Sequence, residues 1–225
     1  MKPITVLIAE DHTIVREGLR QMLSGEKDLQ VVGEALDGRL AVALSRKLSP
    51  DVVLMDIAMP LLNGLEATRQ ILKANPAQRV LVLSAHCDDA YLQSAVEAGA
   101  KGFLLKQSST HELCDGIRAV NQGKTFFSST VARRLEQLYP RRSDREGVVT
   151  KDAVKLTSRE METLQLIAEG KANKEIASDL GIGIKTVEKH REHLMKKLNL
   201  RDTAGITRYA ISAGIIESSV QLTVV

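Results

Sequence analysis

The chain has little of what marks a secreted, disulfide-bonded or membrane protein. Its two cysteines, Cys87 and Cys114, stand far apart, so neither a disulfide framework nor a zinc site is expected. The first apolar run, residues 4–9, is too short for the hydrophobic region of a signal peptide. No stretch approaches the roughly 20 apolar residues that span a bilayer. These absences favour a cytoplasmic protein with no membrane partner.

The composition is that of a folded, soluble protein with two domains. Apolar residues make up 44% of the chain and charged residues 26%, and 225 residues suit two domains of ordinary size. Residues 1–125 hold one more acidic than basic side chain, whereas residues 126–225 hold four more basic than acidic side chains. This asymmetry favours a nucleic-acid contact in the C-terminal half, although such a net charge is also common on solvated surfaces.

Short, unbroken apolar runs recur through the first half of the chain, as is typical of strands buried on both faces of a parallel sheet. These runs are residues 4–9, 31–35, 52–55, 80–83 and 103–105. Helical spacing between them gives the apolar positions Val15, Leu19, Met22 and Leu23, then Leu65, Ile71 and Leu72, then Leu113, Ile117 and Val120. The alternation predicts a doubly wound α/β domain of about five parallel strands, with ligands at the carboxyl ends of the strands.

A change of composition divides the chain. From Tyr139 to Lys155 the apolar periodicity gives way to proline, paired arginines and glycine, which predicts a flexible polar linker. Every later periodic segment is helical, and the first begins at Thr157, whose hydroxyl can form a capping box with Glu160. The predicted domains are residues 1–122, a helix and linker over 123–155, and an all-α domain over 156–217.

Three acidic side chains stand at the ends of predicted strands. Glu10 and Asp11 follow the first strand and Asp56 ends the third, so the three carboxylates meet at one edge of the sheet. Close carboxylates repel one another, and hard oxygen ligands suit a Mg²⁺ ion that keeps several waters and meets a phosphate. Ser84 and Lys106, ending the fourth and fifth strands, add a hydroxyl donor and a cation. Together these side chains predict a site for a phosphoryl group.

Single residues of this pattern also have simpler interpretations. A lone carboxylate at a strand end is more often a turn or helix cap than a ligand, and only the joint pattern favours a site. His12 has no ligand spacing and is interpreted as a surface or cap residue. Pro60 and Gly64 are expected to shape the loop after the third strand.

Residues 1–122 resemble a bacterial response-regulator receiver domain with a flavodoxin-like (CheY-like) fold, and the whole chain resembles the NarL/FixJ family. The resemblance implies that Asp56, within the run from Leu54 to Pro60, is the phosphoacceptor. It implies that Mg²⁺ is bound by Glu10, Asp11, Asp56 and the backbone carbonyl of Ala58.

The same resemblance assigns the remaining groups of the site. Ser84 matches the switch hydroxyl, Phe103 the switch aromatic residue and Lys106 the phosphate-binding lysine. Many receivers have a proline with a cis peptide after this lysine. Gln107 stands there in this chain, so a cis bond is not expected and the lysine loop is expected to be held differently.

A pair of helices is predicted in the C-terminal half. The first covers residues 173–180, Gly181 makes the turn, and the second covers about residues 185–198. Such a pair is a helix-turn-helix, whose second helix enters the major groove of DNA. The expected inward side chains are Ile176, Ala177, Leu180, Val187, Leu194 and Leu198. A mixed-charge outer face is also common in plain helical bundles, so periodicity alone leaves DNA binding open.

The runs from Leu156 to Glu160, from Asn173 to Ala177 and from Lys185 to His190 resemble the LuxR-type DNA-binding domain. That resemblance favours DNA binding by the second helix, although Gly183 stands where the family usually has a serine-like N-cap, which predicts a looser helix start. Base-edge contacts are expected from Lys185, Glu188, Lys189 and Glu192, and phosphate contacts from Thr186, His190, Lys196 and Lys197.

The last predicted helix, residues 203–213, has an apolar face. The resemblance implies that this helix makes the dimer contact, which would pair two copies on a two-fold DNA site. That face consists of Ile206, Tyr209, Ala210 and Ala213.

The expected function is that of a two-component response regulator and not of an enzyme. A sensor histidine kinase phosphorylates Asp56, and the chain then binds double-stranded DNA as a homodimer, with RNA polymerase as a further candidate partner. A rival is a Mg²⁺-dependent phosphohydrolase, which would carry an acid/base aspartate where Ala58 stands. A second rival is a protein-interaction module, which DNA binding that weakens steeply with salt would exclude.

Overall fold

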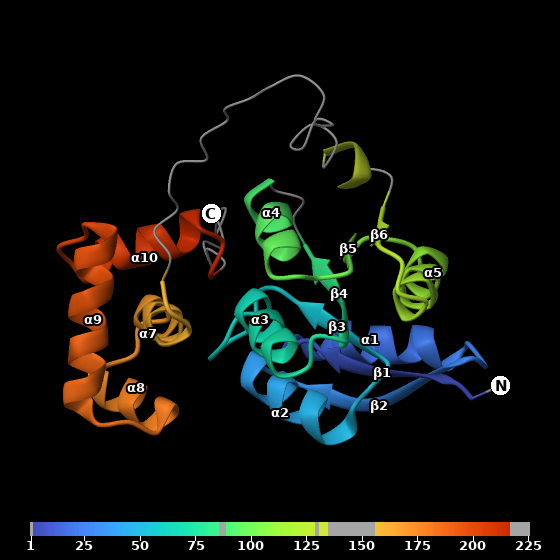
Figure 1. Cartoon of the computed structure of the whole chain (residues 1–225), viewed down its shortest axis with the longest axis horizontal. Helices are drawn as coiled ribbons and strands as arrows, with labels where there is room; N and C mark the ends of the chain where they lie inside the picture. Colours follow the sequence, from blue (N-terminus) through green and yellow to red (C-terminus); the bar gives the residue numbers. More distant parts are fainter. Residues whose placement is uncertain (1, 86–88, 129–130, 135–155, 217–225) are drawn as a thin grey trace, which may run out of the picture. The chain divides into compact units, whose positions relative to one another are not determined.

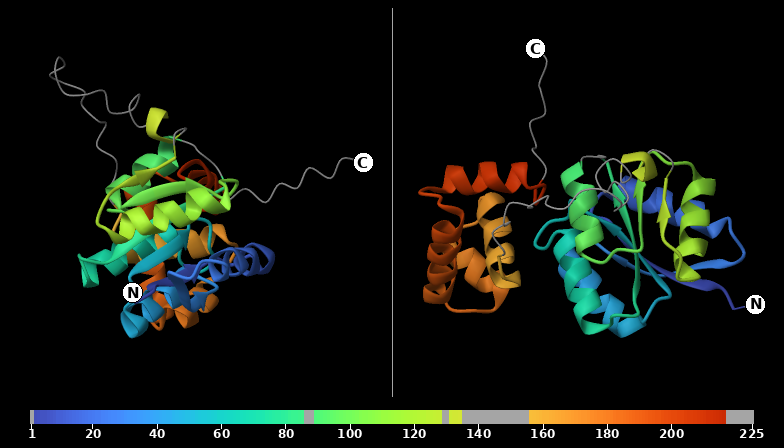
Figure 2. Two further views of the ribbon diagram at one scale, coloured as in Figure 1. Left: turned by 90° about the vertical axis from the view of Figure 1, so that its right-hand side faces the viewer. Right: turned by 45° about the horizontal axis from the view of Figure 1, so that its top comes forward.

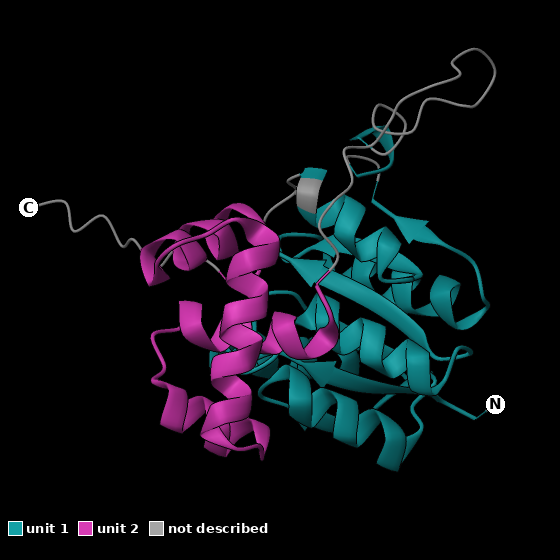
Figure 3. Cartoon of the chain, turned by 60° about the vertical axis from the view of Figure 1, so that its left-hand side comes forward, with its two compact units in different colours: residues 1–151 teal, residues 152–225 magenta. Residues whose placement is uncertain are grey.

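The computed structural model describes residues 2–85, 89–128, 131–134 and 156–216. The chain forms two compact units, residues 1–151 and residues 152–225, which Figure 3 shows in different colours. The predicted linker from Tyr139 to Lys155 lies outside the described residues. None of the helices in the described ranges has both the length and the apolar character that a bilayer span requires.

The N-terminal unit contains one parallel sheet, as predicted. Its strands, in the spatial order β2-β1-β3-β4-β5-β6, are β1 (Ile4–Ala9), β2 (Leu29–Ala35), β3 (Val52–Asp56), β4 (Arg79–Ser84), β5 (Gly102–Leu105) and β6 (Phe126–Phe127). The sheet has one strand more than the five expected. Phe126 and Phe127 pair with Gly102 and Phe103, beyond the predicted domain end at residue 122.

Helices cover both faces of this sheet because successive strand residues point into two apolar cores. In β1, Leu7 and Ala9 belong to one core and Val6 and Ile8 to the other. The first core lies under α2 (Gly38–Leu48), α3 (Gly64–Ala74) and α4 (Asp89–Glu97), and the second under α1 (Thr13–Ser24) and α5 (Thr110–Asn121) (Figures 1 and 2). Met22 of α1, which was expected to face inward, is 42% exposed.

The described part of the C-terminal unit is helical throughout. Its helices are α7 (Ser158–Ala168), α8 (Asn173–Leu180), α9 (Ile184–Leu198) and α10 (Thr203–Ser212). The predicted capping box begins α7, since Glu160 N donates to Thr157 Oγ1 at 3.3 Å and Thr157 N donates to Glu160 Oε2 at 2.8 Å. Gly181, with a φ of 63°, ends α8, and α8 and α9 form the predicted helix-turn-helix (Figure 1).

Five of the six side chains expected inside this pair are buried: Ile176, Ala177, Leu180, Val187 and Leu194. Leu198, at the end of α9, is only partly buried.

The apolar residues of α10 lie partly in the core of their own unit. Ile206 and Ala210 are fully buried within the unit, and Tyr209 and Ala213 are partly buried, so the first two side chains serve the core of the unit. The dimer contact of this helix stays a prediction. A small helical unit uses its strongest apolar stripes for its own core. The large apolar side chain that α10 leaves exposed is Ile211, at 40%.

Candidate functional site

The strand order brings the acidic residues together at the carboxyl edge of the sheet. β1 and β3 are neighbours there, and the chain order reverses between them, which is where doubly wound sheets form a ligand crevice. Glu10 is fully buried and Asp56 is 1% exposed. One ligand atom from each of Glu10, Asp11, His12 and Asp56 lies within 4.8 Å of the others. The three carboxylates therefore meet as expected, and a histidine joins them.

Lys106 lies between two of these carboxylates. Its Nζ is 3.0 Å from Asp56 Oδ1 and 2.9 Å from Glu10 Oε2. Its backbone N–H donates to Ser84 O at 2.8 Å, which holds the ends of β4 and β5 together, and the peptide bond to Gln107 is trans. Burial opposes the positive charge, but Asp56 and Glu10 outweigh it and raise the pKa of Lys106. The lysine is therefore a fixed cation at the site.

Asp56 is held in an unfavourable environment for its negative charge. Burial, followed by the charge of Glu10, raises the pKa of Asp56 to about 6, and Lys106 offsets this only in part. Asp56 Oδ2 is buried without a hydrogen-bond partner. Because three carboxylates face one lysine, the site lacks positive charge, and its hard oxygen donors fit the predicted Mg²⁺ ion.

The other predicted groups lie around this cluster. Ser84, at the end of β4, is 4% exposed, and Phe103 is fully buried in the core beneath α2, α3 and α4. Ala58 lies partly buried in the loop after β3, two residues beyond Asp56. The switch roles of Ser84 and Phe103 and the metal contact of the Ala58 carbonyl stay predictions.

Arg16 is a residue of this site that the sequence analysis missed. Its Nη1 donates to the backbone oxygens of Glu10 at 3.0 Å and Asp11 at 3.2 Å, and its Nε donates to Glu34 Oε2 at 3.1 Å. Arg16 thereby fastens the segment that carries the acidic pair to β2. No pattern in the sequence indicates this role, because two of its acceptors are backbone carbonyls.

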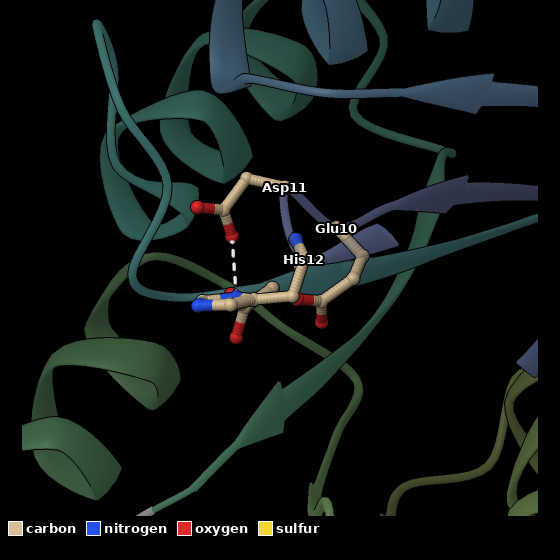
Figure 4. Close-up of side chains that lie close together, drawn as sticks. Glu10, Asp11 and His12 are labelled. Atoms are coloured by element: carbon tan, nitrogen blue, oxygen red, sulfur yellow. Dashed lines mark hydrogen bonds and ion pairs between the residues drawn. The ribbon is translucent and has the colours of Figure 1, made fainter. Parts of the chain in front are cut away.

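His12 is a second such residue: it is exposed and lies at the N-cap position of α1, as interpreted, but its ring also contacts the acidic pair. It occupies the N-cap position of α1 but makes no side-chain cap bond. Instead, Nδ1 lies 3.0 Å from Glu10 Oε1 and 2.9 Å from Asp11 Oδ1 (Figure 4). Burial works against the charged ring, but the two carboxylates prevail and raise the pKa of His12. In the sequence, this contact is indicated by the position of His12 directly after two acidic residues.

We expect Arg16→Gln to weaken Mg²⁺ binding by about tenfold, as is usual for the loss of a residue that holds metal ligands in place. Isothermal titration calorimetry measures this affinity. Arg20→Gln is the matched control, because Arg20 pairs with the other oxygen of Glu34 at 3.7 Å from the next turn of the same helix. Equal Mg²⁺ affinities in the two variants would contradict a positioning role for Arg16.

The outer face of α9 carries most of the predicted DNA contacts. Its exposed residues include Lys185, Thr186, Glu188, Lys189, Glu192 and Lys196, and His190 is partly buried. Lys197 forms an ion pair within the unit, because its Nζ lies 2.6 Å from Glu160 Oε2 on α7. Gly183 is the N-cap of α9 and, because it has no side chain, provides no capping hydrogen bond.

Both units match families of known proteins. Residues 6–118 match the family described as response regulator receiver domain, and residues 154–210 match the bacterial regulatory proteins of the luxR family. The chain belongs to the response regulators with a LuxR-type DNA-binding domain. Both the α/β unit with its acidic edge and the helix-turn-helix unit are therefore accounted for by one family architecture.

Similar proteins match this response regulator over almost its whole length. The transcriptional regulatory protein LiaR of Bacillus subtilis (strain 168) is 42% identical over 207 residues, which cover 92% of this chain and 96% of that protein. The response regulator protein VraR of Staphylococcus aureus is 36% identical over 214 residues, which cover 95% and 99%.

Solved structures agree with this assignment. The response regulator ChrA of a heme-sensing two-component system has a TM-score of 0.53 at 32% identity, covering 96% of this chain and 100% of that one. The response regulator RcsB, solved in complex with DNA, has a TM-score of 0.58 at 28% identity, covering 94% and 99%.

Proposed function

We propose that Asp56 accepts a phosphoryl group from a sensor histidine kinase, and that phosphorylation promotes DNA binding by α9 in a homodimer. The observation that carries this proposal is the buried Asp56 carboxylate, 3.0 Å from Lys106 and with one oxygen lacking a hydrogen-bond partner. In this role the chain is a cytoplasmic regulator and not an enzyme, and its partners include RNA polymerase. The domain limits 1–122, 123–155 and 156–217 belong to the same proposal.

Phosphoryl transfer needs positioning and charge stabilisation more than covalent chemistry. An Asp56 oxygen forms the new P–O bond, while the P–N bond to the donor's phosphohistidine breaks and its electron pair returns to the imidazole. Lys106 neutralises part of the charge on the phosphoryl oxygens from its position beside Asp56. Glu10, Asp11, Asp56 and the Ala58 carbonyl would hold Mg²⁺, which would supply further charge neutralisation when bound.

The phosphorylated site then acts on its surroundings. The aspartyl phosphate adds roughly −1.5 to −2 charges and new acceptor oxygens. Ser84 donates a hydrogen bond to it in this proposal, and Phe103 fills the space that the serine leaves. The backbone N–H of Lys106 donates a hydrogen bond to the backbone oxygen of Ser84. A movement at the end of β4 is therefore transmitted to the end of β5. This change shifts the population toward the dimer that binds DNA.

A hollow beside Lys106 offers a docking surface for the kinase. It measures about 210 Å³ and is lined largely by apolar side chains of α1, β5 and α5. Ile14 at its rim is 86% exposed and Met22 is 42% exposed, and exposed apolar patches of this kind mark interaction sites. We assign this surface to the phosphohistidine-bearing domain of the kinase.

Ile14→Asp is expected to slow transfer from a histidine kinase by at least about tenfold, because it places a charge in the apolar contact (1.4 kcal/mol or more). Phosphorylation by acetyl phosphate, which needs no docking protein, serves as the control and should be unchanged. Equal loss with both donors would show that the substitution damages the site itself.

The proposed DNA contacts divide into two kinds on one helix. Lys185, Glu188, Lys189 and Glu192 are assigned to base edges, and Thr186, His190 and Lys196 to phosphates. Lys197 is also assigned to a phosphate, which it reaches only by leaving its ion pair with Glu160. Lys189→Ala should weaken binding to the preferred site by about 10- to 100-fold and relax its sequence preference. Lys196→Ala should weaken binding to all sequences alike and lower the salt slope by about one. Fluorescence anisotropy over a salt series measures both, and identical behaviour of the two variants would contradict the division.

The whole proposal is tested by gel-shift titration of a DNA fragment selected from random sequence by the phosphorylated protein. Wild type with a small phosphodonor should shift the fragment at lower concentration than without it, and Asp56→Ala should show no such gain. A wild-type affinity for DNA that is the same with and without the phosphodonor would contradict the proposal. Sustained phosphate release would favour the phosphohydrolase, and DNA affinity that does not fall with salt would favour the protein-interaction module.

A further inference from the structure

The acidic site has one ligand atom that a pure magnesium site does not use. His12 Nδ1 lies within the same 4.8 Å group as carboxylate oxygens of Glu10, Asp11 and Asp56. Neighbouring ligands of one ion, each about 2.1 Å from it, lie about 3 Å apart. Nδ1 is 3.0 Å from Glu10 Oε1 and 2.9 Å from Asp11 Oδ1, so the ring nitrogen already has the spacing of a ligand.

The orientation of His12 is not required by the helix that it begins. An N-cap side chain usually accepts a hydrogen bond from the first turn, and His12 makes none. Figure 4 shows its ring turned toward the carboxylate of Asp11. The ring is 58% exposed and Asp11 is 26% exposed, which gives an ion access from solvent on this side.

Buried atoms supply independent support for a cation here. Asp56 Oδ2 is buried without a hydrogen-bond partner, and the side chains of Asp56 and Glu10 are 2% and 0% exposed. Since Lys106 balances only one of the three carboxylates, a divalent ion would neutralise the remainder. The site therefore combines an unpaired hard oxygen of Asp56 and the neighbouring carboxylates with one imidazole nitrogen.

We propose that His12 is a metal ligand, and that this mixed oxygen and nitrogen site binds a first-row transition metal ion such as Co²⁺ more tightly than Mg²⁺. Imidazole suits transition ions, whereas Mg²⁺ prefers oxygen alone. This inference rests on the metal site of the proposed function and adds that the site prefers transition-metal ions over Mg²⁺. Arg16 holds the backbone of Glu10 and Asp11 independently of the imidazole, so replacing His12 removes a ligand without releasing the acidic pair.

The experiment uses the full chain labelled with [¹⁵N]histidine and loaded with Co²⁺. Wild type should show imidazole resonances shifted far outside the diamagnetic range, and His12→Ala should lack them. The ratio of Co²⁺ affinity to Mg²⁺ affinity should fall by at least about tenfold in His12→Ala. His111→Ala is the matched control, because His111 also pairs with an aspartate, Asp115, at 3.1 Å but is 86% exposed on α5. This control should keep the shifted signals and the wild-type ratio.

Two results would overturn the inference: the absence of shifted imidazole signals in Co²⁺-loaded wild type, or an unchanged affinity ratio in His12→Ala. Either would make His12 a hydrogen-bond partner of the carboxylates only. Phosphorylation of Asp56 is measured by mass spectrometry on the same wild-type protein with Mg²⁺. If Asp56 is phosphorylated but neither Co²⁺ measurement gives the expected result, His12 is not a metal ligand and the proposed function still holds. If Asp56 is not phosphorylated, the result contradicts the proposed function.

Discussion

Asp56→Asn is expected to abolish phosphorylation of the response regulator and to make the metal-free protein more stable at neutral pH. The first effect follows because the amide is a poor nucleophile and Asp56 is the carboxylate that Lys106 holds at the edge of the sheet. The second follows because the ionised carboxylate is buried next to Glu10, and a neutral side chain of the same shape avoids that repulsion.

The pH dependence of this stabilisation has a definite sign. The pKa of Asp56 is about 6 in the folded protein against 3.8 for the ordinary carboxyl group. The folded state therefore holds the proton more tightly than the unfolded state, and wild-type stability falls as the pH rises from about 4 to about 6. The difference of about two units corresponds to about 3 kcal/mol above pH 6. Asp56→Asn should lack this decline.

Urea denaturation of metal-free protein at pH 4.5 and pH 7.5, followed by circular dichroism, measures the decline. Added Mg²⁺ should restore much of the wild-type stability at pH 7.5 and have little effect on Asp56→Asn. Asp115→Asn, at a side chain that is 43% exposed on α5, is the control and should behave like wild type. An acid-labile adduct on Asp56→Asn, or an unchanged pH dependence, would contradict the assignment.

The sequence predicts the fold where a local pattern and the three-dimensional arrangement agree. Unbroken apolar runs predicted the first five strands because a strand covered on both faces must be apolar along its whole length. Once those strands were parallel, residues at their carboxyl ends had to share one edge, which explains why Glu10 and Asp56 could be paired across the chain. β6 was missed because two phenylalanines are too short a run to separate from a loop.

The sequence is ambiguous where the same apolar pattern serves two purposes. In α10, Ile206 and Ala210 fill the core of their own unit, so its apolar spacing alone does not identify a dimer contact, which stays a prediction. Met22 fits the helical spacing of α1, yet the inward stripe of α1 buries only Leu19 and Leu23. Periodicity shows that a face is apolar and does not show what covers it. The part played by Arg16 depends on backbone carbonyls, which carry no residue-specific signal.

Gly64→Ala is the substitution from which we expect the largest loss of both stability and phosphorylation at a residue outside the acidic cluster. A Cβ atom at this position would lie 1.7 Å from the backbone oxygen of Asp56 and 2.8 Å from its carbonyl carbon. Contacts this short require the backbone to move. Overpacking of this kind costs about 3 kcal/mol, and a displacement of about 1 Å at the reacting group costs roughly 100-fold in rate.

The matched control is Gly18→Ala in the middle of α1, where nothing lies within 4 Å of the added atom. This change should stabilise the protein by about 0.5–1 kcal/mol, because alanine favours helix, and should leave phosphorylation by acetyl phosphate unchanged. Urea denaturation and the rate of adduct formation measured by mass spectrometry separate the two variants.

The loop between Asp56 and Gly64 explains why the clash cannot be relieved locally. Gly64 N donates to Ile57 O at 2.8 Å, which closes the loop directly behind Asp56. Leu61 within this loop already has a φ of 65°, a backbone conformation that residues other than glycine rarely adopt. The loop therefore has little conformational freedom left. The strain must therefore reach Asp56 or the start of α3. A Gly64→Ala protein with wild-type stability and wild-type phosphorylation would show that the loop is free to move and that the position of Asp56 does not depend on it.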